Sequence, residues 1–496
     1  MYRKVDSAPS QPEDFELPFE GKLSQNNRWV IMANLVPWSE FEEEYAKNFA
    51  VEMGAPALPF RIALGALIIK EKLGISDRET VEQIKENPYL QYLIGRSTYS
   101  NEAPFDPSLL VKFRERITAN LVNRVNEKMV GEVLKKNENE SSNDNSGKER
   151  EEKNRGQLLS DATAAPGDIR YPNDLGLLNQ ARVASEKIID NLYETVREKV
   201  NKKPKTYRNL AQKDYLKVAK QRRPRKKERR KAIKKQLQYI KRNLSHIEQL
   251  IQAGARLEPL SNREYKSLLV IAEVYRQQQW MYDNKTQRID SRIVNLSQPH
   301  IRPIVRGKAG TPVEFGAKLS VSCIDGYVFL DRISWDNFNE SGDLKNQIEA
   351  FKYRTGVYPE SVHVDKIYRT RSNRAFCKER GIRISGPPLG RPKANISAEK
   401  KKQAKEDEII RNGIEGKFGV SKRRFSLNRV MAKLPHTSQT AIAITFLVMN
   451  LSALLRQFFC IFSCFKPNNT FLGNKLLLNV IIMGLVTNKH SSLLQA

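Results

Sequence analysis

Apolar side chains at helical spacing fill the first part of the chain. The densest run, residues 58–73, ends at Gly74, and glycine commonly terminates helices. Ser76 then has the position of an N-cap for a helix over residues 79–86. This pattern predicts an all-α domain at residues 29–134. Two helices joined by a glycine turn resemble a helix-turn-helix, so the domain either contacts DNA or has a dimerisation or structural role.

Composition sets the other boundaries. Residues 1–28 are polar and contain proline, which predicts an irregular arm. Residues 135–156 are almost wholly polar and cannot contribute to a core, so we expect a disordered linker there. A second domain then occupies residues 157–455, and residues 456–496 form an apolar tail to which the sequence assigns no role.

The second domain alternates between the strand period and the helix period. Strands are predicted at residues 157–164, 319–324, 327–333, 361–364 and 382–385. Helices are predicted at residues 344–353, 371–380 and 398–416. Asp325 and Gly326 predict a tight hairpin turn between the second and third strands. If a helical insertion at residues 175–285 is set aside, this order is that of a ribonuclease-H-like α/β domain.

The insertion contains the strongest charge run of the chain. Residues 220–242 hold 13 Lys and Arg but one acid, Glu228. Apolar positions recur from Ile233 to Ile251 in steps of three and four, which predicts an amphipathic helix. We interpret its charged face as tracking phosphates; a solvated basic face is the alternative. The DNA-binding candidates are Arg222, Arg223, Arg225, Lys226, Lys227, Arg229 and Arg230.

The charge of the whole chain points in the same direction. Its 496 residues carry a formal net charge of +29, which favours a polyanionic partner. This charge predicts binding to nucleic acid but does not select DNA over RNA. The four cysteines are too scattered for a disulfide framework, the N-terminus opens no signal peptide, and the apolar run at residues 475–486 is too short to span a membrane. We therefore expect a cytoplasmic protein with no membrane partner.

Three motifs each offer one carboxylate. Asp161 and Asp365 each follow a short apolar run and are expected to end the first and fourth strands. Glu415 lies in a helical pattern, with Arg411 four residues before it and Lys422 seven after it. Neighbouring strands would bring the two aspartates together, and the helix would add the glutamate. Carboxylate oxygens suit Mg²⁺ or Mn²⁺, and two such ions promote phosphodiester cleavage, so these acids are predicted to be catalytic and metal-binding.

Each acid also has a simpler interpretation. Asp161 has the position of a turn or N-cap residue, and Asp365 is followed by basic residues with which it would pair. Glu415 has plausible substitutes on the same helix, namely Glu406, Asp407 and Glu408. Gly416 and Gly419 also argue against a helix that continues as far as the lysine.

The three motifs together resemble a DDE transposase of bacterial insertion sequences, in the family typified by insertion sequence five. The spacing of Arg411, Glu415 and Lys422 is similar to that of the family's third motif, although Glu408 stands where the family has a tyrosine. The resemblance covers roughly residues 30–455. It implies Mg²⁺-dependent or Mn²⁺-dependent DNA cleavage at element ends, followed by strand transfer into target DNA.

The resemblance also implies a bacterial, nucleoid-associated location and several partners. These are DNA, as terminal inverted repeats and as target, and further copies of the chain in a homodimer or higher oligomer. Arg411 and Lys422 would contact DNA phosphate, with surface salt bridges as the alternative. The apolar seam from Ile233 to Ile251 is a candidate oligomer contact, with intramolecular packing as its alternative. Two other functions compete: a metal-dependent nuclease of the same fold that does not join strands, and a non-catalytic nucleic-acid-binding protein or inactive transposase remnant.

Overall fold

The computed structural model describes residues 14–17, 21–49, 56–142, 154–305, 313–386 and 397–464. Residues 1–450 form one compact unit and residues 451–496 a second, and each is described by itself. The apolar run at residues 475–486, whose length was expected to exclude a membrane span, lies outside the described residues.

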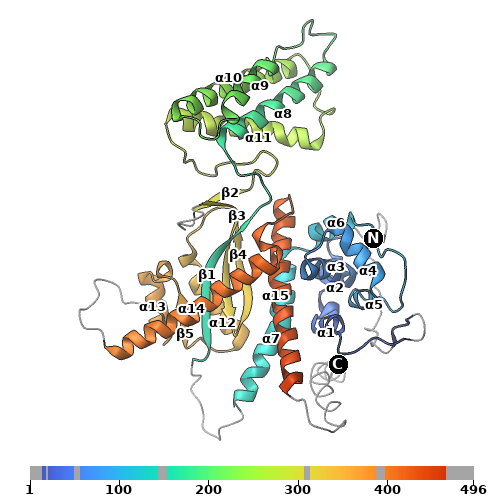
Figure 1. Cartoon of the computed structure of the whole chain (residues 1–496), viewed down its shortest axis with the longest axis vertical. Coiled ribbons are helices and arrows are strands. Elements are labelled where there is room, and N and C mark those ends of the chain that lie inside the picture. Colours follow the sequence, from blue (N-terminus) through green and yellow to red (C-terminus); the bar gives the residue numbers. More distant parts are fainter. Residues whose placement is uncertain are drawn as a thin grey trace. The chain divides into compact units, whose positions relative to one another are not determined.

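The N-terminal part is helical, as predicted (Figure 1). Its helices are α1 Arg28–Leu35, α2 Trp38–Ala46, α3 Phe60–Leu73, α4 Asp77–Glu86, α5 Pro88–Leu93, α6 Leu109–Arg116 and α7 Ala119–Ser142. Gly74 caps α3 in the left-handed region, at φ 68°. The hydroxyl of Ser76 accepts a hydrogen bond from the backbone N–H of Glu79, which confirms the predicted N-cap.

The predicted start of the linker, at residue 135, is wrong. Helix α7 continues to Ser142, eight residues past the last apolar position of its pattern. A helix that is already nucleated gains one backbone hydrogen bond for each residue added, and Lys, Glu and Asn tolerate helical conformation without burial. Residues 143–153 of the proposed linker lie outside the described residues.

A mixed sheet forms the centre of the second domain. Its strands are β1 Gln157–Pro166, β2 Arg302–Val305, β3 Val313–Ile324, β4 Tyr327–Ser334, β5 Ser361–Val364 and β6 Arg383–Ile384. The order is β2-β3-β1-β5-β6, and β4 also pairs with β3. β1 runs antiparallel to β3 and parallel to β5. The sequence did not predict β2, because this four-residue edge strand contains Pro303 and only two buried or apolar positions to mark it.

The predicted hairpin turn is confirmed. Asp325 and Gly326 both have positive φ, 49° and 82°, between the paired ends of β3 and β4. A two-residue turn of this kind matches the twist of the strands that it joins.

We expect Gly326→Ala to lower the free energy of unfolding by about 1 kcal/mol, because alanine resists positive φ while a Cβ here meets only ordinary contacts. Urea denaturation measures the change. The control is Gly131→Ala in α7, where a Cβ meets nothing within 4 Å and alanine favours the helix. Equal effects in the two variants would contradict the conformational explanation.

Helices cover both faces of the sheet. On one face lies α12 Leu344–Thr355, where Gln347 donates a hydrogen bond to the hydroxyl of Ser320 on β3 (3.2 Å). On the other lies α14 Ala398–Arg424, with α13 Arg371–Glu379 beside the sheet edge (Figure 1). The sequence ends α14 near residue 416, but the helix continues through two glycines to Arg424. Burial of Ile414 and Phe418 explains this, because tertiary packing outweighs the weak helix propensity of glycine.

The insertion is a bundle of four helices: α8 Asp174–Thr195, α9 Arg208–Ala219, α10 Lys226–Gln252 and α11 Asn262–Asp283. The predicted apolar seam belongs to α10. Leu237, Ile240 and Ile247 are buried in one cluster with apolar side chains of α8 and α11, whereas Ile251 is 40% exposed. Intramolecular packing therefore occupies the seam, and its buried part offers no surface to a second copy of the chain.

Helix α10 begins later than the charge run. Residues 220–225 connect α9 to α10, because Pro224 lacks a backbone N–H and disfavours helical conformation at Arg223. Arg225 is the N-cap residue of α10.

The last described helix is α15 Pro435–Cys464, which the sequence analysis did not identify as a possible span. Among the described residues, it is the one helix long and apolar enough to cross a membrane, over Pro435–Phe459. Because 72% of its most apolar window is buried inside the structure, as in the core helix of a soluble protein, this is weak evidence for a span.

Candidate active site and nucleic-acid interface

Asp161 lies in the middle of β1. The expectation that it ends the first strand is wrong, because the strand continues for five residues to Pro166. The register explains this: Ala162 pairs with Ser320, and pairing with β3 continues to Pro166 opposite Gly316. An apolar run marks only the doubly buried part of a strand, whereas backbone hydrogen bonds extend it further.

Asp161 and Asp365 approach each other through the parallel pairing of β1 with β5. Leu159 is opposite His363 in this register. Side chains alternate along a strand, so two residues further on the same face come Asp161 in β1 and Asp365 directly after β5. The prediction that the two strands are neighbours is confirmed.

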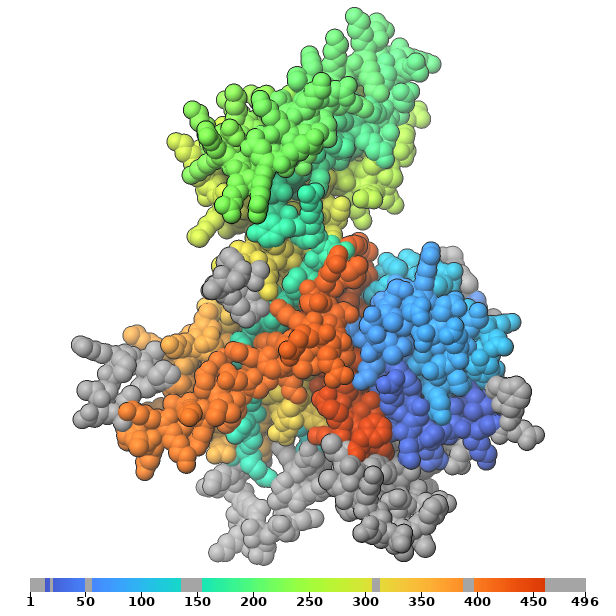
Figure 2. Space-filling model, in the orientation of Figure 1, coloured from blue at the N-terminus to red at the C-terminus, as the bar shows by residue number. Residues whose placement is uncertain are grey.

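Helix α14 covers this face of the sheet. A Cβ on Gly413 would lie 3.3 Å from Cδ2 of Leu159, so the helix backbone passes close over β1. Asp407, earlier on the helix, lies above β5, with its Oδ1 3.7 Å from Nδ1 of His363. Arg411 lies on α14 between Asp407 and Gly413, and Glu415 follows Gly413. The charges of both residues act on Asp161. The opposite side of α14, drawn in orange, lies at the surface (Figure 2).

The environment of Asp161 disfavours its charge. Burial raises the pKa of its carboxyl to about 6, although the carboxylate accepts a hydrogen bond from the backbone N–H of Ala162 (2.7 Å). The negative charges of Asp365 and Glu415 raise this pKa as well, while the guanidinium of Arg411 lowers it. The charges of Asp365 and Glu415 thus both reach Asp161.

The environments of the acids on α14 favour Glu415 as the third acid of the candidate site, beside Asp161 and Asp365. Asp407 is buried and forms an ion pair with an arginine of β6 (2.8 Å). Glu408 pairs with Arg411 (2.7 Å). Glu415, by contrast, lies near enough to Asp161 for its charge to act there. Its carboxylate also accepts a hydrogen bond from Arg411 (3.0 Å), and its side chain is 55% exposed.

The acids do not form a closed set of metal ligands. Within the described ranges, no three His, Cys, Asp or Glu side chains lie close enough to hold a metal ion. Asp365 follows β5 at the surface and accepts a hydrogen bond from the backbone N–H of Lys366 (2.6 Å), while Glu415 extends toward Arg411. Mutual repulsion favours such separation. The donors are all carboxylate oxygens, which fit a hard divalent cation.

The two residues expected to contact DNA near the acids have partners within the chain. Arg411 pairs with two glutamates, and these hydrogen bonds raise the pKa of its guanidinium. Nζ of Lys422 lies 3.5 Å from Oε1 of Glu314 on β3. Both side chains therefore form the salt bridges that the sequence analysis gave as the alternative, and their contact with DNA stays a prediction.

Tyr368, which is not among the candidates of the sequence analysis, lies near enough to Asp161 to feel its charge. It ends the 3₁₀ turn Lys366–Tyr368, and its side chain is fully buried. Burial and the charge of Asp161 both raise the pKa of its phenol, and the hydroxyl has no hydrogen-bond partner among the described residues. Its position three residues after Asp365 is the one signal that the sequence offered.

The basic candidates of the insertion differ in exposure. Six of them are exposed: Arg222, Arg223, Arg225, Lys226, Lys227 and Arg229. Arg230 is half-buried instead. It donates a hydrogen bond to the backbone carbonyl of Tyr282 (2.8 Å), and its guanidinium lies 4.0 Å from the centre of that residue's ring. Arg230 therefore ties α10 to α11 and is not an open site for DNA.

Comparisons with known proteins bear on the two domains. A family model described as a transposase DDE domain matches residues 362–452, which include Asp365 and Glu415. A model described as a transposase domain (DUF772) matches residues 17–116. The uncharacterized protein ORF8 in the nfe locus of Rhizobium meliloti is 32% identical over 114 residues, which are 22% of this chain and 55% of that protein. The chain thus spans about half the length of this relative.

No solved structure matches the chain significantly. The two family models match in chain order, with the helical domain first and the domain that holds two of the three acids second. The chain is thus similar to transposase domains over these two segments.

Proposed function

We propose that the chain is a transposase that cuts DNA at the ends of its element and joins those ends to target DNA. One observation supports the proposal: pairing of β1 with β5 brings Asp161 and Asp365, from distant segments, to one face of the sheet, and α14, which carries Glu415, covers that face. The finer assignments, a ribonuclease-H-like catalytic domain and the insertion-sequence-five family, rest on the order of the strands and on the spacing of the third motif.

The three acids would hold two Mg²⁺ or Mn²⁺ ions, and bound ions of this kind activate a nucleophile and stabilise a leaving oxygen. Asp161 is half-buried, and partial loss of solvent together with the nearby acids disfavours its charge, so a cation there would offset an existing cost. Glu415 pairs with Arg411 in the structure described here. If Glu415 turned toward a cation, Arg411 would keep its pair with Glu408, and Nη1 of its guanidinium would become available to a DNA phosphate.

The proposed reaction has two stages. In the first, water attacks a phosphodiester at the element end, and the bond to the 3′ oxygen breaks to leave a 3′-hydroxyl. In the second, this hydroxyl attacks a target phosphodiester, so one bond forms for each bond broken. A nuclease of the same fold would complete only the first stage.

The test uses a labelled duplex that carries the DNA bordering the gene, together with supercoiled plasmid as target and Mg²⁺. Nicking of the duplex followed by its covalent attachment to the plasmid supports the transposase. Nicking without attachment supports the nuclease, and binding without nicking supports the inactive remnant.

The insertion would bind the DNA ends through its exposed basic residues. We expect the double substitution Lys227→Gln and Arg229→Gln to weaken duplex binding about tenfold near 0.1 M salt. The slope of log K against log salt concentration should fall by about 1.8, because each phosphate contact accounts for about 0.9. Fluorescence anisotropy over a salt series measures both effects.

The matched control is Arg263→Gln with Lys266→Gln. This pair removes the same charges from exposed positions of α11 in the same bundle. If the two pairs lower the slope equally, binding reflects net charge and not a defined interface. Oligomer formation and the role of the N-terminal helical domain in DNA contact or dimerisation are further parts of the proposal.

A further inference from the structure

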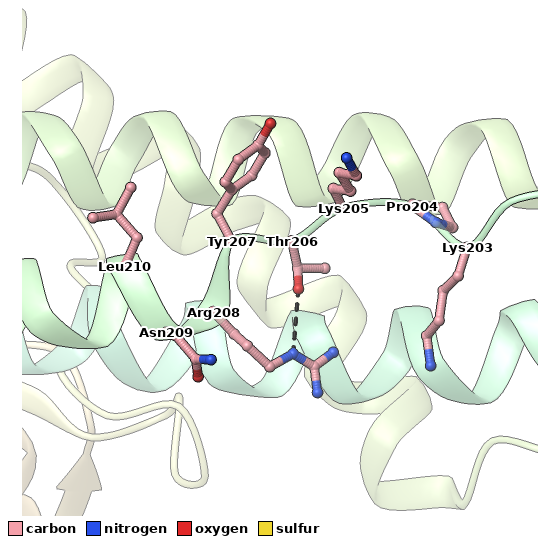
Figure 3. Close-up of a pocket in the computed structure, with 8 residues that line it drawn as sticks. All are labelled: Lys203, Pro204, Lys205, Thr206, Tyr207, Arg208, Asn209 and Leu210. Atoms are coloured by element: carbon pink, nitrogen blue, oxygen red, sulfur yellow. Dashed lines mark hydrogen bonds between the residues drawn. The ribbon is translucent and has the colours of Figure 1, made fainter.

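The connection between α8 and α9 forms a shallow hollow of about 600 Å³, lined by residues 203–210 (Figure 3). Lys205, Tyr207 and Leu210 extend to one side of this segment, whereas Arg208 and Asn209 extend to the other. Arg208 is engaged there by Asp190 of α8 (2.8 Å).

Tyr207 is an unusual residue in this hollow. Its side chain is 51% exposed, and its backbone has φ 54°, a region that costs a non-glycine residue about 1–3 kcal/mol. A large aromatic residue in this conformation at the surface gains little from burial. The surrounding structure must hold it in place, and the contacts of its ring show how.

Arg242 of α10 holds the ring. Its guanidinium lies 4.5 Å from the ring centre of Tyr207 and 5.1 Å from that of Tyr239. Nε and Nη2 of Arg242 are buried and have no hydrogen-bond partner in the described part of the chain. The guanidinium of Arg242 is thus stabilised by the rings of Tyr207 and Tyr239, and in turn it holds the exposed ring of Tyr207 in place.

A row of cations leads to this ring along α10. Lys227, Lys231, Lys235 and Arg242 are offset by four, four and seven residues, so they share one face of the helix. The first two are exposed, and the third pairs with Asp214 of α9 (2.7 Å). At 1.5 Å per residue the row is about 22 Å long. It joins the basic segment at the start of α10 to Tyr207.

We propose that Tyr207 is a stacking platform for an unpaired DNA base, with the adjoining phosphates bound along the lysines of α10 and by Lys205. The proposal rests on the proposed function in one respect, that DNA is the ligand. An exposed ring beside a row of cations is the usual composition of a single-strand site, because any base can stack on an aromatic face. In a duplex, neighbouring bases already cover those faces.

The test measures binding of the full-length protein in EDTA, where cleavage does not interfere. The probes are a single-stranded oligonucleotide with one 2-aminopurine, whose fluorescence is quenched by stacking, and the matched duplex. Tyr207→Ala should weaken single-strand binding by about fivefold or more and abolish the quenching, with duplex binding changed less than twofold. Tyr207→Phe should keep both signals, because the ring remains.

The control is Tyr265→Ala, which removes a tyrosine of similar exposure, 46%, from α11 of the same bundle. It should change neither signal, and equal melting temperatures exclude unfolding of the variants. Unchanged single-strand binding in Tyr207→Ala, or an equal loss for single strand and duplex, would overturn the proposal, as would loss of quenching in Tyr207→Phe. Failure of the proposed function is distinct: the parent would then bind and quench but never cut DNA with Mg²⁺.

Discussion

Asp161→Asn, Asp365→Asn and Glu415→Gln are each expected to lower the rate of Mg²⁺-dependent strand cleavage at least about 100-fold, with duplex binding in EDTA retained. Each amide keeps the shape of the side chain and removes one negative oxygen ligand. Loss of a single carboxylate should therefore weaken the binding of the cations and misplace them, while the basic surface of the insertion remains intact. Single-turnover cleavage of the labelled duplex measures the rate.

Glu406→Gln is the matched control on the same helix. Glu406 is exposed and one of the candidates that the sequence could not separate from Glu415. It should leave the cleavage rate within about twofold, because a surface position away from the site contributes little. Full activity in Glu415→Gln together with loss in Glu406→Gln would show that the third acid has been chosen wrongly. Full activity in Asp161→Asn would remove the basis of the proposed site.

Asp161→Asn should at the same time stabilise the metal-free protein, by about 1–3 kcal/mol at pH 7.5 in EDTA. The pKa of this carboxyl is about 6 in the folded protein, against its ordinary 3.8. The folded state therefore binds more protons than the unfolded state between these values. The contribution of Asp161 to the free energy of unfolding is therefore unchanged below about pH 4, becomes unfavourable as the pH rises toward 6, and stays unfavourable by a constant amount above 6. Asparagine has no charge to bury, so it removes that penalty.

Urea unfolding at pH 7.5 and at pH 4 measures the difference, which should largely vanish at the lower pH. Asp336→Asn is the control, because its side chain is 75% exposed and its loss should matter by no more than about 0.5 kcal/mol. Adding Mn²⁺ at pH 7.5 should stabilise the parent and not Asp161→Asn. If Asp161→Asn destabilises the metal-free protein, the carboxylate is a structural residue and not a strained ligand.

The local signals that the sequence contains concern single elements. Short apolar runs predicted β1 and β5, and the pair Asp325 and Gly326 predicted the hairpin turn; the structure confirms these elements. Charge and spacing identified the amphipathic face of α10. These signals are reliable because each depends on a few consecutive residues, whose period and turn chemistry act without distant partners.

Boundaries required contacts that the sequence does not display. β1 extends past its apolar run because β3 pairs with it, and α14 passes through Gly416 because Ile414 and Phe418 are buried beneath it. Helix α10 begins at Lys226, after Pro224, although the charge run begins at residue 220. In each case, the free energy that fixes the end of the element comes from tertiary packing or pairing and not from local propensity.

The candidate site divides in the same way. The sequence by itself determined which acids were eligible, that the chain is strongly basic, and the order of strands and helices. Only the tertiary structure showed that the charge of Glu415 acts on Asp161, that Arg230 is occupied by Tyr282, and that most of the seam of α10 is buried. It also raised the pKa of one aspartate. The physical reason is that burial and charge proximity are properties of residues far apart in the chain, and they exist only once the sheet and α14 have brought those residues together.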